Sequence, residues 1–372
     1  MKIDPFKVEI WMNAHETACR YNLAETCVDS LTLGELAALT GGLELETLTN
    51  VKLTYGAIEG SARLRAAIAA LYTSRTPEEV LVTHGAIGAN ALAYAALVDP
   101  GDEVVAITPA YQQHVSIPRS LGAEVKELRL RAEDGYLPDL GALSALMTPK
   151  TRLISLTNPN NPTGSVIDPA GLEGIVKIAA AHGAMVLCDE VYRGVDQASD
   201  GLGPSIADLY DQGVAIGGMS KAFALAGLRL GWIIAPPQVR EQVMIHRDYT
   251  TISVGMIDDH LAAVALERRE AILARNRAIV RANLPLLDAF VAETPQVRWV
   301  RPAGGNVALL DYGRPIPSEI LCRRLLEDTG VLVVPGSCFD MEGTIRVGFG
   351  NPMSALKPGL QALSAFLQHL PG

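Results

Sequence analysis

Between about residue 80 and residue 235, short apolar runs alternate with helical stretches, and this alternation restricts the possible folds more than any other feature. The expected strands are 80–83, 103–107, 152–156, 184–188, 214–217 and 230–235, and the expected helices are 88–98 and 172–182. Such alternation is typical of a mainly parallel sheet covered by helices, whose ligands bind beyond the carboxyl ends of the strands. We therefore expect an α/β fold with a site at that edge of the sheet.

After about residue 271 the pattern changes, which predicts a second, smaller α+β domain. A helical, arginine-rich stretch is followed by two strands, a helix and a strand, at residues 267–284, 297–300, 307–310, 318–327 and 331–334. The first forty-odd residues are too short to fold alone, so we expect them to pack on this smaller unit. The sequence thus predicts a large cofactor-binding domain of residues 45–271 and a small domain formed by residues 1–44 and 272–372.

The composition excludes several classes of protein. The formal net charge of −10 argues against a nucleic-acid-binding or membrane-surface protein, because both need a cationic face. Neither a secretory signal nor a membrane-spanning segment is expected, since the N-terminus lacks an apolar run and no long apolar stretch follows. The five scattered cysteines favour neither disulfides nor a zinc site. A cytoplasmic protein without a metal is expected.

The chemistry is concentrated around Lys221, which lies in the sequence Met-Ser-Lys-Ala-Phe. Upstream are Asn161, in an Asn-Pro-Thr-Gly turn, and Asp189 with Tyr192; Arg229 follows eight residues after the lysine. A lysine amine can form a Schiff base with pyridoxal phosphate, and a carboxylate can keep the pyridine nitrogen protonated so that the ring acts as an electron sink. The combination points to pyridoxal phosphate as the cofactor.

In order and spacing these motifs resemble those of the class I/II aminotransferase family of fold-type-I pyridoxal-phosphate enzymes, from Tyr55 onward. The resemblance implies the PLP-dependent transferase fold, with a mainly parallel, seven-stranded-type sheet in the large domain. It implies that Lys221 carries the cofactor as an aldimine and serves as acid and base. Asp189 would pair with the pyridine nitrogen, while Tyr192 and Asn161 would contact the ring oxygen.

A cofactor phosphate needs backbone N–H groups, a helix N-terminus and a cation. Gly85, Ala86 and Ile87, between an expected strand and helix, supply the first two. By the resemblance, Arg229 is the cation and Ser220 adds a hydroxyl. One position departs from the family: Gly218 stands where a serine or threonine is usual, so one phosphate hydrogen bond is expected to be missing or replaced by water.

The resemblance also implies a stacking residue and a dimer. Tyr111 matches the aromatic residue that stacks on the pyridine ring. Tyr55 matches the tyrosine that reaches the phosphate of the neighbouring subunit's cofactor, which would make the protein a symmetric homodimer.

For the substrate, Arg346 matches the arginine that holds the α-carboxylate by two parallel hydrogen bonds, a task for which planar guanidinium geometry is suited. Asn306 is a candidate for lining the substrate pocket. The family's N-terminal Gly-x-Gly-x-Pro-like segment is not recognisable in residues 22–27. The contacts to the substrate side chain are therefore not predicted.

We expect transamination between an L-amino acid and a 2-oxo acid, the commonest chemistry of the family, although the same cofactor geometry supports other reactions. Residues 219–232, 247–253 and 330–336 also resemble capreomycidine synthase-type members, which eliminate water from a hydroxylated arginine and close a ring. A guanidino substrate would need a carboxylate, for which Glu16, Glu25 and Asp29 are candidates. A non-catalytic, cofactor-binding sensor is a further alternative, but no basic helix-turn-helix segment precedes Tyr55.

Overall fold

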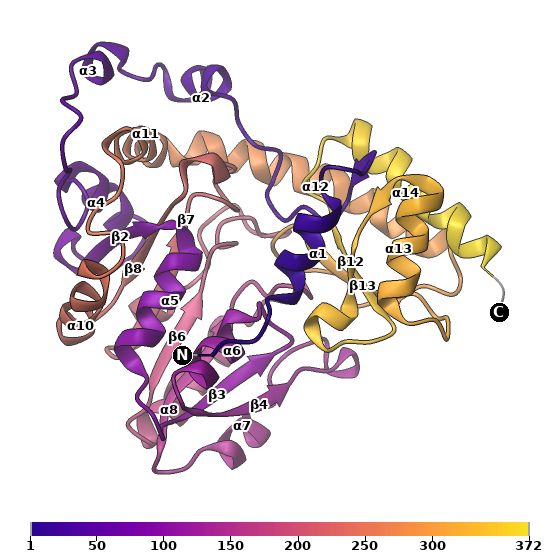
Figure 1. The fold of residues 1–372 in the computed structure, drawn as a ribbon, viewed down its shortest axis with the longest axis horizontal. Helices are drawn as coiled ribbons and strands as arrows, with labels where there is room; N and C mark the ends of the chain where they lie inside the picture. The colour runs from indigo at the N-terminus through magenta and orange to yellow at the C-terminus, as the bar shows by residue number, and fades with distance from the viewer. Residues whose placement is uncertain (1, 371–372) are drawn as a thin grey trace.

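A seven-stranded mixed sheet forms the centre of the computed structural model, which describes residues 2–370 (Figure 1). In spatial order its strands are β2 (Val80–His84), β8 (Leu230–Ile234), β7 (Gly213–Gly218), β6 (Met185–Asp189), β5 (Thr151–Thr157), β3 (Glu103–Thr108) and β4 (Glu124–Arg129). Strand β8 is antiparallel to both of its neighbours, and the other pairs are parallel. The expected α/β class with a mainly parallel sheet is confirmed.

Helices cover both faces of this sheet, which explains why its inner strands are almost entirely buried. Leu81 and Leu187 face one hydrophobic cluster, whereas Val82 and Val186, their neighbours in the chain, face another. This follows from the alternation of side chains along a strand. The first face is covered by α5 (Gly85–Leu97), α6 (Gln113–Ser120) and α10 (Pro237–Asp248), and the second by α4 (Ala62–Ala69), α8 (Pro169–Ala181) and α11 (Met256–Glu267).

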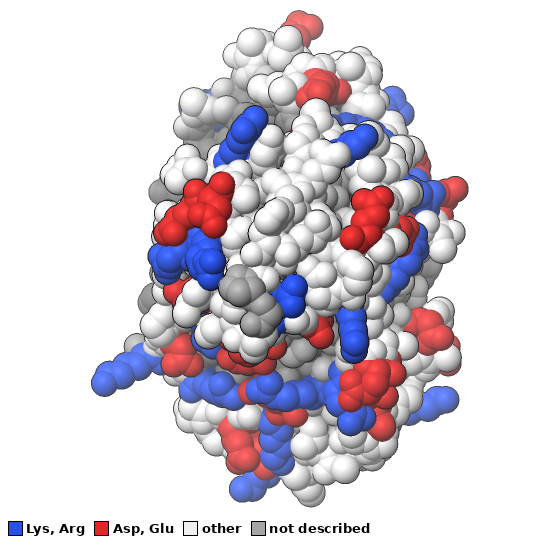
Figure 2. Space-filling view, turned by 90° about the vertical axis from the view of Figure 1, so that its right-hand side faces the viewer, with Lys and Arg blue, Asp and Glu red and all other residues white. Residues whose placement is uncertain are grey.

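The C-terminal part has its own antiparallel sheet of four strands, with helices packed beside it. The strand order is β12 (Val334–Pro335), β13 (Thr344–Gly348), β10 (Val307–Asp311) and β9 (Arg298–Trp299). The helices of this part are α12 (Arg269–Glu293), α13 (Ser318–Thr329) and α14 (Met353–His369). On the face at the right of Figure 1, Lys and Arg side chains are interspersed with Asp and Glu (Figure 2).

The N-terminal segment lies against the C-terminal part. Strand β1 (Tyr21–Asn22) pairs in parallel with β11 (Val331–Leu332), and the indole N–H of Trp11 in α1 (Lys7–His15) donates to the carbonyl of Val333 at 2.9 Å. Figure 1 shows α1 beside β12. The boundaries of the two expected domains stay a prediction.

The remaining elements are short and connect the larger ones. They are α2 (Leu33–Thr40), α3 (Leu45–Thr49), α7 (Leu140–Leu146), α9 (Ile206–Leu209) and the 3-10 turns η1 (Pro77–Glu79), η2 (Ala132–Asp134), η3 (Ala226–Leu228) and η4 (Gly336–Phe339). No helix within residues 2–370 is both long enough and apolar enough to span a membrane.

Candidate active site

A cavity of about 330 Å³ lies where the large sheet meets the N-terminal segment and the C-terminal part. Asp189 ends β6 and Thr157 ends β5, so the cavity lies at the carboxyl ends of parallel strands, as expected. Ten of the predicted site residues line it: Ala86, Ile87, Tyr111, Asn161, Asp189, Tyr192, Ser220, Lys221, Arg229 and Arg346. Residues from distant parts of the chain thus converge on one site.

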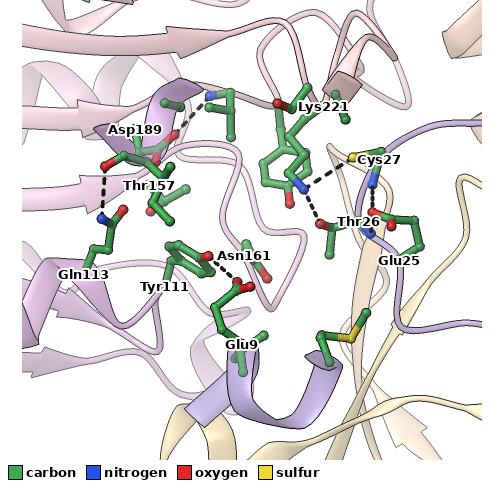
Figure 3. A pocket seen from close by; sticks show the side chains of 18 of the residues that line it. Glu9, Glu25, Thr26, Cys27, Tyr111, Gln113, Thr157, Asn161, Asp189 and Lys221 are labelled. Carbon is green, nitrogen blue, oxygen red and sulfur yellow. Dashed lines mark hydrogen bonds between the residues drawn. The ribbon is translucent and has the colours of Figure 1, made fainter. Parts of the chain in front are cut away.

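Lys221 projects into this cavity from the segment after β7 (Figure 3). Its Nζ donates to the hydroxyl of Thr26 at 2.5 Å and lies 3.5 Å from Sγ of Cys27. Both partners come from the N-terminal segment, so this segment holds the amine in place. The Glu25 carboxylate accepts the N–H groups of Thr26 and Cys27 at 2.7 and 2.8 Å, which rigidifies the same turn.

Asp189 is buried at the end of β6, only 6% exposed. Its Oδ2 accepts a hydrogen bond from the amide of Asn90 at 2.8 Å, and its Oδ1 accepts the N–H of Val191 at 3.2 Å. Burial raises the pKa of the Asp189 carboxyl, although these hydrogen bonds oppose the rise. A cation placed against Asp189 would therefore be strongly favoured, because it would stabilise the charged carboxylate.

Arg346, on β13, is also buried. It donates from Nη1 to Oδ1 of Asn161 at 3.2 Å and from Nη2 to the carbonyl of Ala24 at 2.9 Å. Its Nε and the hydroxyl of Tyr192 are both buried and have no hydrogen-bond partner within residues 2–370. Buried polar atoms are nearly always paired in folded proteins, so these two atoms are suited to bind a polar ligand in the cavity.

At the start of α5, the chain forms a cradle suited to an anion. Gly85 has a φ of +66°, and its open α-carbon lets the Arg229 guanidinium approach: an added Cβ would lie 3.2 Å from Nη2. The first turn of α5 contains no acidic residue, so the positive end of its dipole is unopposed. At Gly218 a Cβ would lie 3.3 Å from the Cβ of Ala86, so a side chain there would crowd this cradle.

Tyr111 connects the large sheet to α1. Its hydroxyl donates to Oε1 of Glu9 at 2.5 Å (Figure 3). The centroid of its ring lies 4.7 Å from the centroid of the Phe6 ring. Burial, together with Glu9, raises the pKa of the Tyr111 phenol, which therefore stays protonated. Helix α1 thus forms one wall of the cavity.

The sequence profile of "Aminotransferase class I and II" matches residues 44–363. The chain belongs to this family. It is 34% identical to capreomycidine synthase from Streptomyces vinaceus over 359 residues, which cover 96% of this chain and 92% of that protein. Many solved structures are similar, among them the following two. A PLP-dependent aminotransferase from Streptococcus suis has a TM-score of 0.96 and 42% identity, with all of both chains covered. The PLP-dependent cyclase OrfR has a TM-score of 0.92 and 31% identity, with 99% and 98% covered.

Class I and II aminotransferases are pyridoxal-phosphate-dependent, and the residues of this cavity fit that group. The cradle with Arg229 suits a phosphate, Asp189 suits a protonated ring nitrogen, and the free Tyr192 hydroxyl suits a ring oxygen. No group of three or more His, Cys, Asp or Glu side chains within residues 2–370 is arranged to hold a metal.

Some predicted residues of this aminotransferase family member lie elsewhere. Tyr55 is 77% exposed and does not line the cavity. Asn306 is buried outside the lining, although its amide has no hydrogen-bond partner among the described residues. Of the three candidate acids, Glu16 and Glu25 line the cavity, whereas Asp29 turns toward Arg275 at 3.4 Å.

Several residues of the cavity were not predicted. Among them are Glu9, Thr26, Cys27 and Asn90. The first three lie in the N-terminal segment, which contains no recognisable family motif, so nothing in the local sequence indicates a role. Asn90 has a weak signal, because a polar residue on an otherwise apolar helix five residues after Gly85 must face either solvent or a polar partner.

Proposed function

We propose that this chain is a pyridoxal-phosphate-dependent aminotransferase that moves an amino group between an L-amino acid and a 2-oxo acid. The observation that carries the proposal is that the Lys221 amine, the Asp189 carboxylate and the Arg346 guanidinium face one cavity. When bound, the cofactor supplies an electron sink for charge that develops at the α-carbon of the substrate.

Each residue then has a defined task. Lys221 would hold the cofactor covalently and afterwards move the proton of the substrate α-carbon. Asp189 would keep the proton on the ring nitrogen, and Arg346 would bind the α-carboxylate. The N-terminus of α5, Ser220 and Arg229 would hold the phosphate. Tyr192 and Asn161 would contact the ring oxygen, and Tyr111 would stack on the ring.

The functional unit in this proposal is a homodimer in which Tyr55 reaches the neighbouring site. The support is an exposed apolar area on two segments that lie together, since a Cβ on Gly56 would lie only 3.1 Å from Cγ of Met256. These segments and the loop before α11 expose large apolar side chains, namely Leu53, Tyr55, Ile58, Tyr249, Ile252 and Ile257. Light scattering should give twice the 39.6 kDa mass of the chain, and a monomer would contradict the dimer. Tyr55→Phe should weaken retention of the cofactor without dissociating the dimer.

The second candidate function is a cofactor-dependent elimination and ring closure on a hydroxylated arginine. It is supported by the similarity to capreomycidine synthase and to the cyclase OrfR, and by Glu16 and Glu25 in the cavity. The chemistry at the α-carbon begins in the same way. The two reactions diverge after the α-proton has been removed, because elimination then releases water and needs no acceptor.

A half-reaction experiment separates these functions. Each amino acid is added to the cofactor-loaded enzyme, and the absorption of the cofactor is followed. An aminotransferase converts the cofactor to pyridoxamine phosphate, and a 2-oxo acid then restores the original spectrum. Turnover of 3-hydroxyarginine without an acceptor, together with no half-reaction with common amino acids, would favour the cyclase. A spectrum unchanged by any amino acid or by 3-hydroxyarginine would favour a non-catalytic sensor.

A further inference from the structure

Four side chains on helix α1 or directly after it line the cavity, and the proposed function gives none of them a role. Val8, Glu9 and Met12 lie on one side of the helix, and Glu16 follows its last turn with helical backbone angles. Residues spaced by three, four or seven positions share a helix face, so the two glutamates bracket the apolar side chain of Met12. This wall combines an apolar stretch with two carboxylates.

Each of the other charged side chains of the cavity has a partner. Under the proposed function, Arg229 binds the phosphate, Arg346 binds the α-carboxylate and Asp189 faces the ring nitrogen. Glu25 is also satisfied, because its carboxylate accepts the backbone N–H groups of Thr26 and Cys27 at 2.7 and 2.8 Å. Glu9 and Glu16 remain.

Neither of these two carboxylates forms an ion pair with any residue of the described range 2–370. Oε1 of Glu9 accepts the Tyr111 hydroxyl, which fixes the carboxylate in the cavity while Oε2 stays free (Figure 3). Glu16 accepts no side-chain hydrogen bond within the same residues and is exposed at the end of α1. The cavity is suited to a polar ligand, because the buried hydroxyl of Tyr192 and Nε of Arg346 face it without partners among residues 2–370.

We propose that Glu9 and Glu16 form a subsite for the positive end of a substrate side chain, so that the enzyme acts on basic L-amino acids. This inference rests on the proposed function and names its substrate class. With the α-carboxylate on Arg346, the methylene groups of a lysine- or arginine-like side chain run along Met12 and Val8. The terminal ammonium or guanidinium then meets the free carboxylate oxygens. Aspartate and glutamate are disfavoured, because their side-chain carboxylates would face the same two anions.

Comparing arginine with citrulline tests the effect of the side-chain charge. The two amino acids have nearly the same shape, but citrulline replaces the guanidinium with a neutral urea group. The rate of the half-reaction divided by the amino acid concentration should be at least about tenfold higher for arginine than for citrulline. This factor corresponds to the free energy of one charge-assisted hydrogen bond. Glu9→Gln and Glu16→Gln should each reduce this ratio, because a neutral amide no longer attracts the guanidinium. Asp29→Asn is the matched control, because Asp29 lies in the same N-terminal segment but turns toward Arg275, and it should keep the wild-type ratio.

A binding measurement separates failure of the subsite from failure of the reaction. Calorimetry with the borohydride-reduced holoenzyme, which cannot turn over, should also show tighter binding of arginine than of citrulline. If arginine binds more tightly than citrulline but no half-reaction occurs, the subsite is supported and the aminotransferase proposal is rejected. Equal binding of the two ligands, or a preference for aspartate, would overturn the subsite even if transamination occurs.

Discussion

The amide of Asn90 donates a 2.8 Å hydrogen bond to Oδ2 of Asp189, and it is the one side-chain donor that this carboxylate has within residues 2–370. Asn90 belongs to α5, the helix whose first turn forms the anion cradle. One helix thus supports both ends of the proposed cofactor site. Because burial raises the pKa of Asp189, the amide helps to keep the carboxylate charged.

Asn90→Ala should therefore slow the half-reaction by roughly 10- to 100-fold, the range expected when a hydrogen bond to a buried charge is lost. The pH profile should move as well, because the pKa of Asp189 rises further without the amide. Asn50→Ala, at an exposed position after α3, is the control. An unchanged rate and pH profile would show that Val191 N–H alone suffices.

Asp189→Asn should retain the cofactor and lose on the order of 10²–10³ in rate, because a neutral partner no longer holds the proton on the ring nitrogen. Cofactor content is measured by absorbance, and the rate by single-turnover kinetics. A variant with near wild-type turnover would mean that the reaction does not depend on this carboxylate.

Lys221→Ala should abolish turnover, although the variant can still bind the cofactor noncovalently through the cradle. In the wild type, borohydride should fix a pyridoxyl group on Lys221, which peptide mass spectrometry would locate. Modification of another lysine instead would refute the assignment.

Arg346→Ala should weaken every amino donor and every 2-oxo acid acceptor, since all of them carry the carboxylate that Arg346 is proposed to bind. Arg346→Lys keeps the charge but not the planar pair of donors, so it should recover only part of the affinity. Arg301→Ala removes an exposed arginine paired with Asp288 and serves as the control. Substrates that bind equally well to all three variants would exclude this role.

Gly231→Ala should loosen the anion cradle. The added Cβ would lie 2.4 Å from the backbone N of Ala86, a contact that forces the start of α5 to move. Such overpacking costs about 1–3 kcal/mol, and if this cost falls on the cofactor-bound form, retention of pyridoxal phosphate should fall by roughly 5- to 150-fold. Gly227→Ala, where the added Cβ meets nothing within 4 Å, provides the matched control. Equal retention in both variants would mean that the cradle tolerates the shift.

The strands of the large sheet could be predicted because both faces are buried, so their apolar runs are visible in the sequence. Strand β4 was not predicted, since it lies at the edge of the sheet and its sequence, Glu-Val-Lys-Glu-Leu-Arg, is largely charged. Within the cavity, residues with familiar neighbours in the chain were recognised. Thr26 was not, because its contact with Lys221 joins positions 195 residues apart and neither local sequence predicts the other.

Helix α1 has a consequence for how the protein is made. The indole of Trp11, which anchors this helix, bonds to a carbonyl 322 positions further along the chain. During synthesis, α1 is therefore made well before the surface on which it docks. All strands of the large sheet, which lie within residues 80–234, are also made before that surface, so the large sheet can form before the wall that carries Glu9 is in place.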